Sequence, residues 1–148
     1  MFAAYRNPAR TYAGVAVETS VAGARPIDLV VMLYDGACEG IIKAIAHMQD
    51  GNIAAKGEAI TRVIRIIDEG LNAALDPRAG DISLQLRDLY NYMGHRLLLG
   101  SLRNDTAPLE EVRALLLDLK GAWEQIASNP LPRLPIPVPM PAVPRLNS

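Results

Sequence analysis

Histidines and carboxylates are the side chains that most often support catalysis or hold a metal, and this chain places few of them suitably. His47 and His95 are the only histidines, and neither has a second histidine or a cysteine at metal-ligand spacing. A di-iron or di-manganese helical bundle needs Glu-x-x-His on its helices, and that motif is absent. Gly-rich phosphate loops, the G-x-S-x-G elbow and CxxCH are absent too. We therefore expect no metal and no other cofactor.

His95 is the one residue with a catalytic alternative, because phosphotransfer domains are four-helix bundles with an exposed helical histidine. The run His95-Arg96-Leu97-Leu98-Leu99-Gly100 is similar only in part to their His-x-x-Lys-Gly pattern. Leucine stands where the lysine should be and the glycine comes one residue late, so phosphohistidine would lose charge stabilisation and access. Asp35 likewise has no second titratable group placed to tune it as a general base. We expect a protein that is not an enzyme, with acid-labile phosphate on His95 as the sign of the alternative.

The overall composition argues against several kinds of partner. At 148 residues the chain suits one domain with a sizeable core. The formal net charge is -1 and the basic residues are scattered among acidic ones, so nucleic acid is not an expected partner. No apolar run reaches membrane-spanning length, so we expect no membrane insertion. Cys38 is the single cysteine, which is compatible with a reducing cytosol and a cytoplasmic location.

The stretch from Ile27 to Met48 is more apolar than one buried helix face requires. Steps of three and four place one set of residues on one side of a helix: Val30, Leu33, Ala37, Ile41, Ala44 and Met48. A second set lies roughly 100° around the helix: Ile27, Val31, Tyr34, Cys38, Ile42 and Ile45. Either other parts of the chain bury this second stripe, or it awaits a partner.

Turn-forming residues divide residues 26–128 into four helices. Pro26 is well suited to the first turn of the first helix, and Asn52 and Asp81 can cap the second and third. The second helix is expected to continue to Ala74. The breaks fall at Asp50-Gly51, at Asp76-Pro77 with Gly80, and at Asn104-Asp105-Thr106.

Each of the last three helices carries one apolar seam at helical spacing. The second has Ile53, Gly57, Ile60, Ile64, Ile67, Leu71 and Ala74; the third has Leu86, Tyr90 or Leu89, Met93, Leu97 and Gly100; the fourth has Leu109, Val112, Leu116, Leu119, Trp123 and Ile126. Short connections make successive helices antiparallel neighbours. The sequence therefore predicts an all-α fold, an antiparallel up-down-up-down four-helix bundle.

The two ends of the chain differ from this bundle. Residues 1–25 hold a brief apolar patch, Tyr12, Val15 and Val17, that could lie on the bundle. Residues 129–148 are rich in proline, so polyproline II or disorder is expected there. A solvated extension is the simple interpretation of this tail, and a ligand for a proline-binding module is the other.

Seven glycines fall within the expected helices, where each would cost up to about 1 kcal/mol relative to alanine if exposed. One explanation is close approach of helix backbones. The other is a bundle that adjusts when a partner helix docks. The glycines are Gly36, Gly40, Gly57, Gly70, Gly94, Gly100 and Gly121.

Four blocks of sequence are specific together, although none would be specific alone. They are Tyr12-Ala13-x-Val15-x-Val17-Glu18-Thr19; Pro26-x-x-Leu29-Val30-x-Met32-Leu33-Tyr34-Asp35-Gly36-Ala37; Gly51-x-Ile53-Ala54-Ala55-Lys56-Gly57-Glu58-Ala59-Ile60 with Ile66-Ile67-Asp68; and Leu89-Tyr90-x-Tyr92-Met93 with Leu102-Arg103-Asn104-Asp105. On these blocks the chain resembles the flagellar secretion chaperones that bind flagellin, the FliS family, from Tyr12 to Ile126.

The resemblance implies a bundle that binds the C-terminal segment of newly made flagellin, keeps it unpolymerised and docks on the flagellar export gate. It implies that Tyr12, Val15 and Val17 form a movable cap over part of the groove, with Tyr12 also at a position implicated in gate docking. Second-stripe positions supply the groove candidates, any of which could instead belong to the core. They are Ile27, Val31, Tyr34, Cys38, Ile42, Val63, Ile66, Leu98, Leu102 and Leu115.

Two departures from the family pattern limit this comparison. Arg25-Pro26-Ile27 stands where the family usually has Ser-Pro-His, so a serine cap is lost, at about 1 kcal/mol unless another group caps the helix. The Pro-rich tail lies outside the resemblance. A homodimer that uses the spare stripe in the absence of cargo stays an alternative to the export chaperone.

Overall fold

The computed structural model describes residues 25–128, and all regular structure in this range is helical, which confirms the all-α class. The cap residues Tyr12, Val15 and Val17 and the Pro-rich tail lie outside the described residues. The elements are α2 (Pro26–Gln49), α3 (Ile53–Arg65), the π-helix η2 (Ile66–Asn72), the short 3-10 helix η3 (Pro77–Ala79), α4 (Asp81–Arg103) and α5 (Thr106–Ser128).

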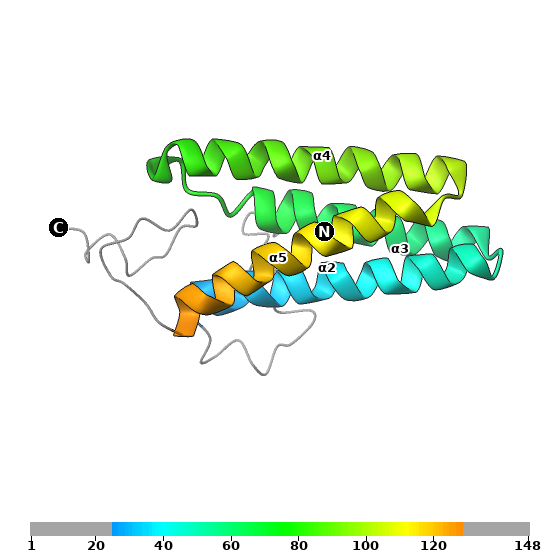
Figure 1. Ribbon diagram of the computed structural model, residues 1–148, viewed down its shortest axis with the longest axis horizontal. Helices are drawn as coiled ribbons and strands as arrows, with labels where there is room; N and C mark the ends of the chain where they lie inside the picture. Colours follow the sequence, from blue (N-terminus) through cyan, green and yellow to red (C-terminus); the bar gives the residue numbers. More distant parts are fainter. Residues whose placement is uncertain (1–24, 129–148) are drawn as a thin grey trace.

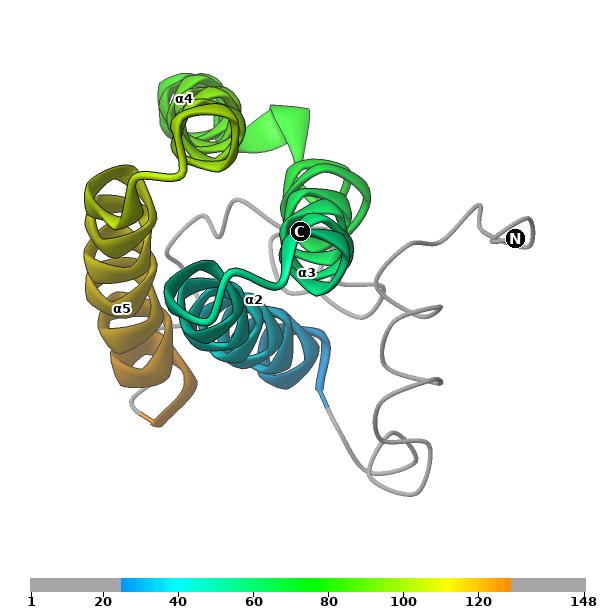
Figure 2. The same cartoon turned by 90° about the vertical axis from the view of Figure 1, so that its right-hand side faces the viewer.

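The four long helices form the expected antiparallel bundle, with α2, α3, α4 and α5 alternating in direction along its long axis (Figure 1). Figure 2 looks along this axis and places the helices at four corners. Helix α2 packs against α3, η2 and α5, and α4 packs against the same three elements. The diagonal pairs, α2 with α4 and α3 with α5, share no backbone contact. Side chains from all four helices therefore meet in one central core.

Helix α2 is buried on two sides because it lies between α3 and α5. Its first stripe is buried throughout, as the spacing predicts. The second stripe is divided between core and surface. Ile27, Tyr34 and Cys38 are buried, Val31 and Ile45 are half-buried, and Ile42 is exposed. Most of the apolar surplus on α2 is thus covered by the chain itself.

The second helix departs from its predicted seam at both ends. Ile53, which the heptad steps place in the seam, has 74% of its surface exposed, because the buried face of α3 begins one turn later at Lys56. A continuous α-helix to Ala74 is wrong, since the chain widens into a π-helix from Ile66. This widening brings two successive residues, Ile66 and Ile67, into the core together. In α4 the seam uses Tyr90, while Leu89 is half-buried.

Two of the helical glycines lie where a side chain would not fit, and three others lie in open space. At Gly40 an added Cβ would lie 2.5 Å from Val63 Cγ2, and at Gly100 it would lie 2.5 Å from Leu109 Cδ1. Close approach therefore explains these two positions, because a side chain there would collide with a core residue. At Gly57, Gly94 and Gly121 an added Cβ would meet no atom within 4 Å. Packing does not require glycine at these three positions.

A chain of polar aromatic groups crosses the core between the diagonal helices. The Trp123 indole N–H donates to the Tyr34 hydroxyl at 2.9 Å, and the Tyr34 and Tyr90 hydroxyls are hydrogen-bonded at 2.5 Å. All three side chains are buried. Burial raises the pKa of Tyr34 to about 12, and it also raises the pKa of Tyr90. Both hydroxyls therefore stay neutral near pH 7 and join α2, α4 and α5 through hydrogen bonds.

The expected loss of a serine cap on α2 is offset by the third residue of the helix. The Asp28 carboxylate accepts from the Arg25 backbone N–H at 3.0 Å and from the Arg25 Nε at 2.9 Å. Hydrogen bonding to this guanidinium lowers the pKa of Asp28. A carboxylate in the first turn also complements the helix dipole, so α2 begins at Pro26 without a serine.

Candidate functional site

The predicted groove residues fall into two groups. Ile27, Tyr34, Cys38, Val63 and Ile66 are buried in the hydrophobic core. The structure places these five inside the bundle, where they offer no open area to a partner in this conformation. Burial also raises the pKa of the Cys38 thiol, which leaves it protonated and unreactive at neutral pH.

The other candidates are accessible. Val31 and Leu115 are half-buried against the core, whereas Ile42 and Leu98 are each 50% exposed and Leu102 is 84% exposed. They do not form one groove. Val31 and Ile42 are on α2, Leu98 and Leu102 are on α4, and Leu115 is on α5. The accessible apolar residues are thus spread around the bundle.

Ile53 and Leu102 are the most exposed large apolar residues among residues 25–128, at 74% and 84%, and Leu98 is 50% exposed. Leu98 and Leu102 are four residues apart on α4, so they lie on one face of the helix. Ile53 is at the start of α3, which the Lys56 side chain joins to the end of α4. We call Ile53, Leu98 and Leu102 the α3/α4 patch.

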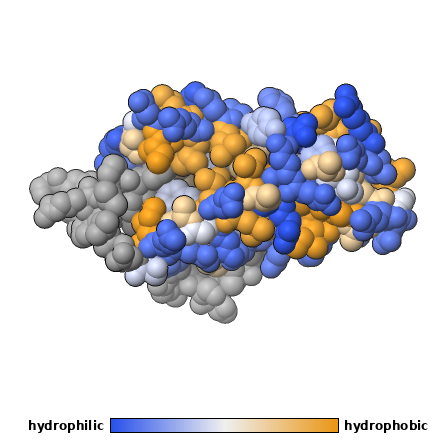
Figure 3. Space-filling view, viewed as in Figure 1, coloured by the Kyte–Doolittle hydropathy of each residue, from blue (hydrophilic) through white to orange (hydrophobic). Residues whose placement is uncertain are grey.

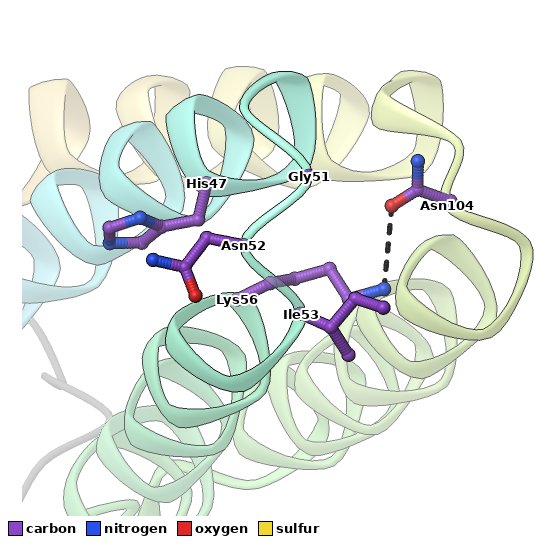
Figure 4. Close-up of a pocket in the computed structure, with 6 residues that line it drawn as sticks. All are labelled: His47, Gly51, Asn52, Ile53, Lys56 and Asn104. Atoms are coloured by element: carbon purple, nitrogen blue, oxygen red, sulfur yellow. Dashed lines mark hydrogen bonds between the residues drawn. The ribbon is translucent and has the colours of Figure 1, made fainter.

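A lysine fixes the end of the bundle that carries this patch. Lys56 is 9% exposed, and its Nζ donates to the Ser101 carbonyl at 3.0 Å and to Asn104 Oδ1 at 3.4 Å. Asn104 ends α4 in the left-handed conformation, so the ammonium group binds a helix C-terminus, where the helix dipole favours a cation. Figure 4 shows the Lys56 side chain extending past Ile53 towards Asn104.

A small pocket of about 210 Å³ lies beside this lysine. His47, Asn52, Ile53, Lys56 and Asn104 line it together with Gly51 (Figure 4). Asn52 caps α3 by accepting from the Ala55 N–H at 3.2 Å. Lys56 and Asn52 both hold helix ends, so these two polar side chains have structural roles. The α2–α3 and α4–α5 corners are therefore held together by side chains.

The face formed by α4 and α5 carries a mixed surface, on which hydrophobic areas are interrupted by polar ones (Figure 3). Glu111 on α5 accepts from the Tyr92 hydroxyl at 2.5 Å and from Arg96 Nε at 2.6 Å, and both donors are on α4. These hydrogen bonds lower the pKa of Glu111. The three side chains thus join the two helices outside the core.

Sequence reasoning missed four exposed apolar residues. The heptad steps put Ile53 in the seam, and the apolar stripes include none of Ile82, Leu84 and Leu117, yet each of the four is at least 40% exposed. The sequence does hold an indication that Ile53 is exposed. It directly follows the Asn52 cap, and the first residue of a helix often lies at the end of a bundle. For Leu117 there is no comparable indication, because it lies in an apolar run next to the buried Leu116.

Residues 25–128 contain no catalytic constellation. His95 is exposed, and the glycine of its run, Gly100, packs beneath Leu109 instead of opening space beside the histidine. Within residues 25–128 no group of three His, Cys, Asp or Glu side chains is placed to hold a metal ion. Over the same residues, no helix is both long enough and apolar enough to cross a membrane.

Comparison with known proteins agrees with this geometry. The model of the family described as flagellar protein FliS matches residues 8–130. The flagellar secretion chaperone FliS of Salmonella typhimurium is 44% identical over 119 residues, which cover 80% of this chain and 88% of the relative. The corresponding chaperone of Escherichia coli is 39% identical over 122 residues, covering 82% and 90%. That of Bacillus subtilis is 33% identical over 122 residues, covering 82% and 87%.

These matches extend over the whole described bundle and assign it to a family of chaperones, not of enzymes. The phosphotransfer alternative on His95 therefore has no support. The chain belongs to the FliS family of flagellar secretion chaperones.

Proposed function

We propose that the protein is a cytoplasmic export chaperone that binds the C-terminal segment of flagellin, prevents its premature polymerisation and delivers it to the flagellar export gate. Membership of the FliS family supports the flagellar role. The observation that carries the binding surface is the α3/α4 patch, where Leu98 and Leu102 present adjacent turns of one helix to solvent and Ile53 stands at the neighbouring corner.

The spacing of this patch suits an amphipathic helix. Apolar residues at helical spacing on a partner can pack against Leu98 and Leu102 in the manner of a helix laid on a hydrophobic surface. Each Å² of apolar area buried contributes ~25 cal/mol. Ordering an unfolded partner segment opposes this gain, so the complex is firm but reversible. Reversible binding is what a protein that must hand over its cargo requires.

The other accessible groove candidates would let the chaperone contact more of the cargo than a single helix. Ile42 and Val31 on α2 and Leu115 on α5 lie on other sides of the bundle. Cargo that contacts them as well must wrap around the chaperone in several pieces. The cap role of Tyr12, Val15 and Val17 and the gate contact of Tyr12 belong to the same proposal and rest on the family alone.

The test is a calorimetric titration with the C-terminal segment of flagellin. Leu102→Asp and Leu98→Asp should each weaken binding at least tenfold, because a carboxylate replaces an apolar contact. Leu84→Asp is the matched control, since Leu84 is on the same helix and is 50% exposed, as Leu98 is. Circular dichroism should show all three variants fully helical.

Two results would contradict the proposal. The absence of heat with the unmodified protein at tens of micromolar would remove flagellin as the cargo. Equal loss of binding in the three variants would remove the α3/α4 patch as its site. A molecular mass that rises with protein concentration, and that Leu102→Asp abolishes, would show that the patch serves a homodimer.

A further inference from the structure

The space between the start of α2 and the end of α5 forms a hollow of about 380 Å³. Its apolar wall consists of Val31, Met32 and Ala127, and the charged residues Arg25, Asp28 and Glu124 line it as well. Val31 and Ala127 pack against the core from this side. The hollow thus gives access to the flank of the core at the bundle end opposite the α3/α4 patch (Figure 1).

The proline-rich tail starts at this hollow. Ser128, the last residue of α5, is part of its lining, and the next two residues are Asn129-Pro130. An Asn-Pro pair favours a turn, and proline cannot continue the helix. A turn at this place would direct the following residues back over the hollow.

The composition of the tail suits a segment that occupies an apolar hollow. Leu131, Leu134, Ile136 and Val138 alternate with prolines, and the tail contains Arg133 and Arg145 but no Asp or Glu. Polyproline II advances about 3.1 Å per residue, so the first ten residues of the tail span about 30 Å, more than enough to cross two turns of helix. Because proline restricts the free chain, ordering such a segment costs less entropy than ordering an ordinary one.

One carboxylate of the hollow complements the positive charge of the tail. Asp28 already binds Arg25, which also lines the hollow, but Glu124 lies 3.8 Å from Lys120, at the long end for an ion pair. Glu124 is therefore well placed to receive a guanidinium. Arg133 follows the expected turn by only a few residues and supplies one.

We infer that residues 131–148 fold back as an intramolecular ligand, with Leu131, Leu134 and Ile136 in the hollow between α2 and α5 and with Arg133 beside Glu124. The matched family region ends at residue 130, so this ligand is an addition to the family bundle. The contact is made within one chain and needs no cargo. It shields Val31, which would otherwise be an accessible apolar residue on α2.

Methionine methyl groups provide the test on the full-length protein. Met32 lines the hollow, and Met48 is on the same helix 16 residues away, about 24 Å along its axis. A nitroxide attached to Val138→Cys, in a Cys38→Ala background with carbon-13-labelled methionine methyls, should broaden the Met32 signal and leave the Met48 signal sharp. The same chain with the nitroxide reduced is the reference.

Tail substitutions supply the matched control. Leu134→Ser with Ile136→Ser should restore the Met32 signal in the labelled chain without altering helicity, and Arg133→Glu should restore it in part. An unaffected Met32 would overturn the inference, as would broadening that the serine substitutions leave unchanged. Broadening that appears only as the protein concentration rises would assign the hollow to the tail of a second copy and would also overturn it. A nitroxide can also be attached to Ala16→Cys. If this label broadens the Met32 signal and the tail label does not, the N-terminal segment occupies the hollow and the inference is overturned.

Discussion

Removing the Tyr34 hydroxyl should destabilise the bundle far more than removing the Tyr90 hydroxyl, although both are buried in one network. Tyr34 accepts from the Trp123 N–H and shares a hydrogen bond with Tyr90, so Tyr34→Phe leaves two buried polar groups without partners. Each unsatisfied group costs about 1–3 kcal/mol. The expected loss in free energy of unfolding is therefore about 2–6 kcal/mol, a large fraction of the stability of a small domain.

Tyr90→Phe is the matched control because it removes one hydroxyl of the same pair and leaves the Trp123–Tyr34 bond intact. Its expected cost is about 1 kcal/mol. In the double variant the Tyr90 hydroxyl is no longer present to be orphaned, so the combined loss should be smaller than the sum of the single losses. A double-mutant cycle should thus give a coupling free energy of about 1 kcal/mol or more.

Urea unfolding followed by far-ultraviolet circular dichroism measures all four proteins under one set of conditions. The slope of unfolding free energy against urea concentration should stay constant, because the surface exposed on unfolding does not change. Equal losses in the two single variants would refute the reasoning, since the central position of Tyr34 would then have no energetic consequence. Strict additivity in the double variant would refute it as well.

Three further predictions concern other parts of the bundle. Burial holds the folded-state pKa of Tyr34 and of Tyr90 above the ordinary value of 10. Their contribution to the free energy of unfolding is therefore complete below pH 10 and should fall above it, by about 1.4 kcal/mol per pH unit for each tyrosine. Urea titrations at pH 9 to 11 would measure this fall. Gly40→Ala should destabilise the bundle by about 1–3 kcal/mol, because the added Cβ would collide with Val63. Gly57→Ala, whose Cβ would lie in open space, should stabilise it by up to about 1 kcal/mol. Thermal melts that rank the two variants the other way would contradict the close approach of helices at Gly40. Lys56→Met should lower the free energy of unfolding by about 1–2 kcal/mol, because two hydrogen bonds are lost. Lys43→Met, a change at an exposed position, should alter it little. Equal urea midpoints for the two variants would show that Lys56 does not stabilise the end of α4.

Helical spacing was enough to predict the bundle and most of its core, because a stripe of apolar residues can be buried only against another stripe. It succeeded for Ile60, Ile67 and Leu71 and failed for Ile53. Spacing assigns a residue to a face but does not say where the neighbouring helix ends. The π-helix was unpredictable for a related reason, since its extra residue per turn depends on what packs on both sides of η2.

The candidate surface was harder to predict than the core. On α2 the spacing could not tell Cys38, which is buried, from Ile42, which is exposed, because both belong to one stripe. The buried network was equally hidden. Tyr34, Tyr90 and Trp123 are far apart in sequence, and their hydrogen bonds follow from the crossing of three helices.

The Lys56 contact makes the two ends of the bundle mechanically unequal. At the patch end, one ammonium group and the close packing of Gly100 on Leu109 join the corners, while the other end carries the longer α3–α4 connection and both chain exits. Amide exchange should accordingly be slower near Ser101 than near the start of α4. A surface that is already rigid loses little conformational freedom when it is occupied. A partner on the proposed α3/α4 site would therefore meet a preformed surface, and most of the ordering cost of binding would fall on the partner.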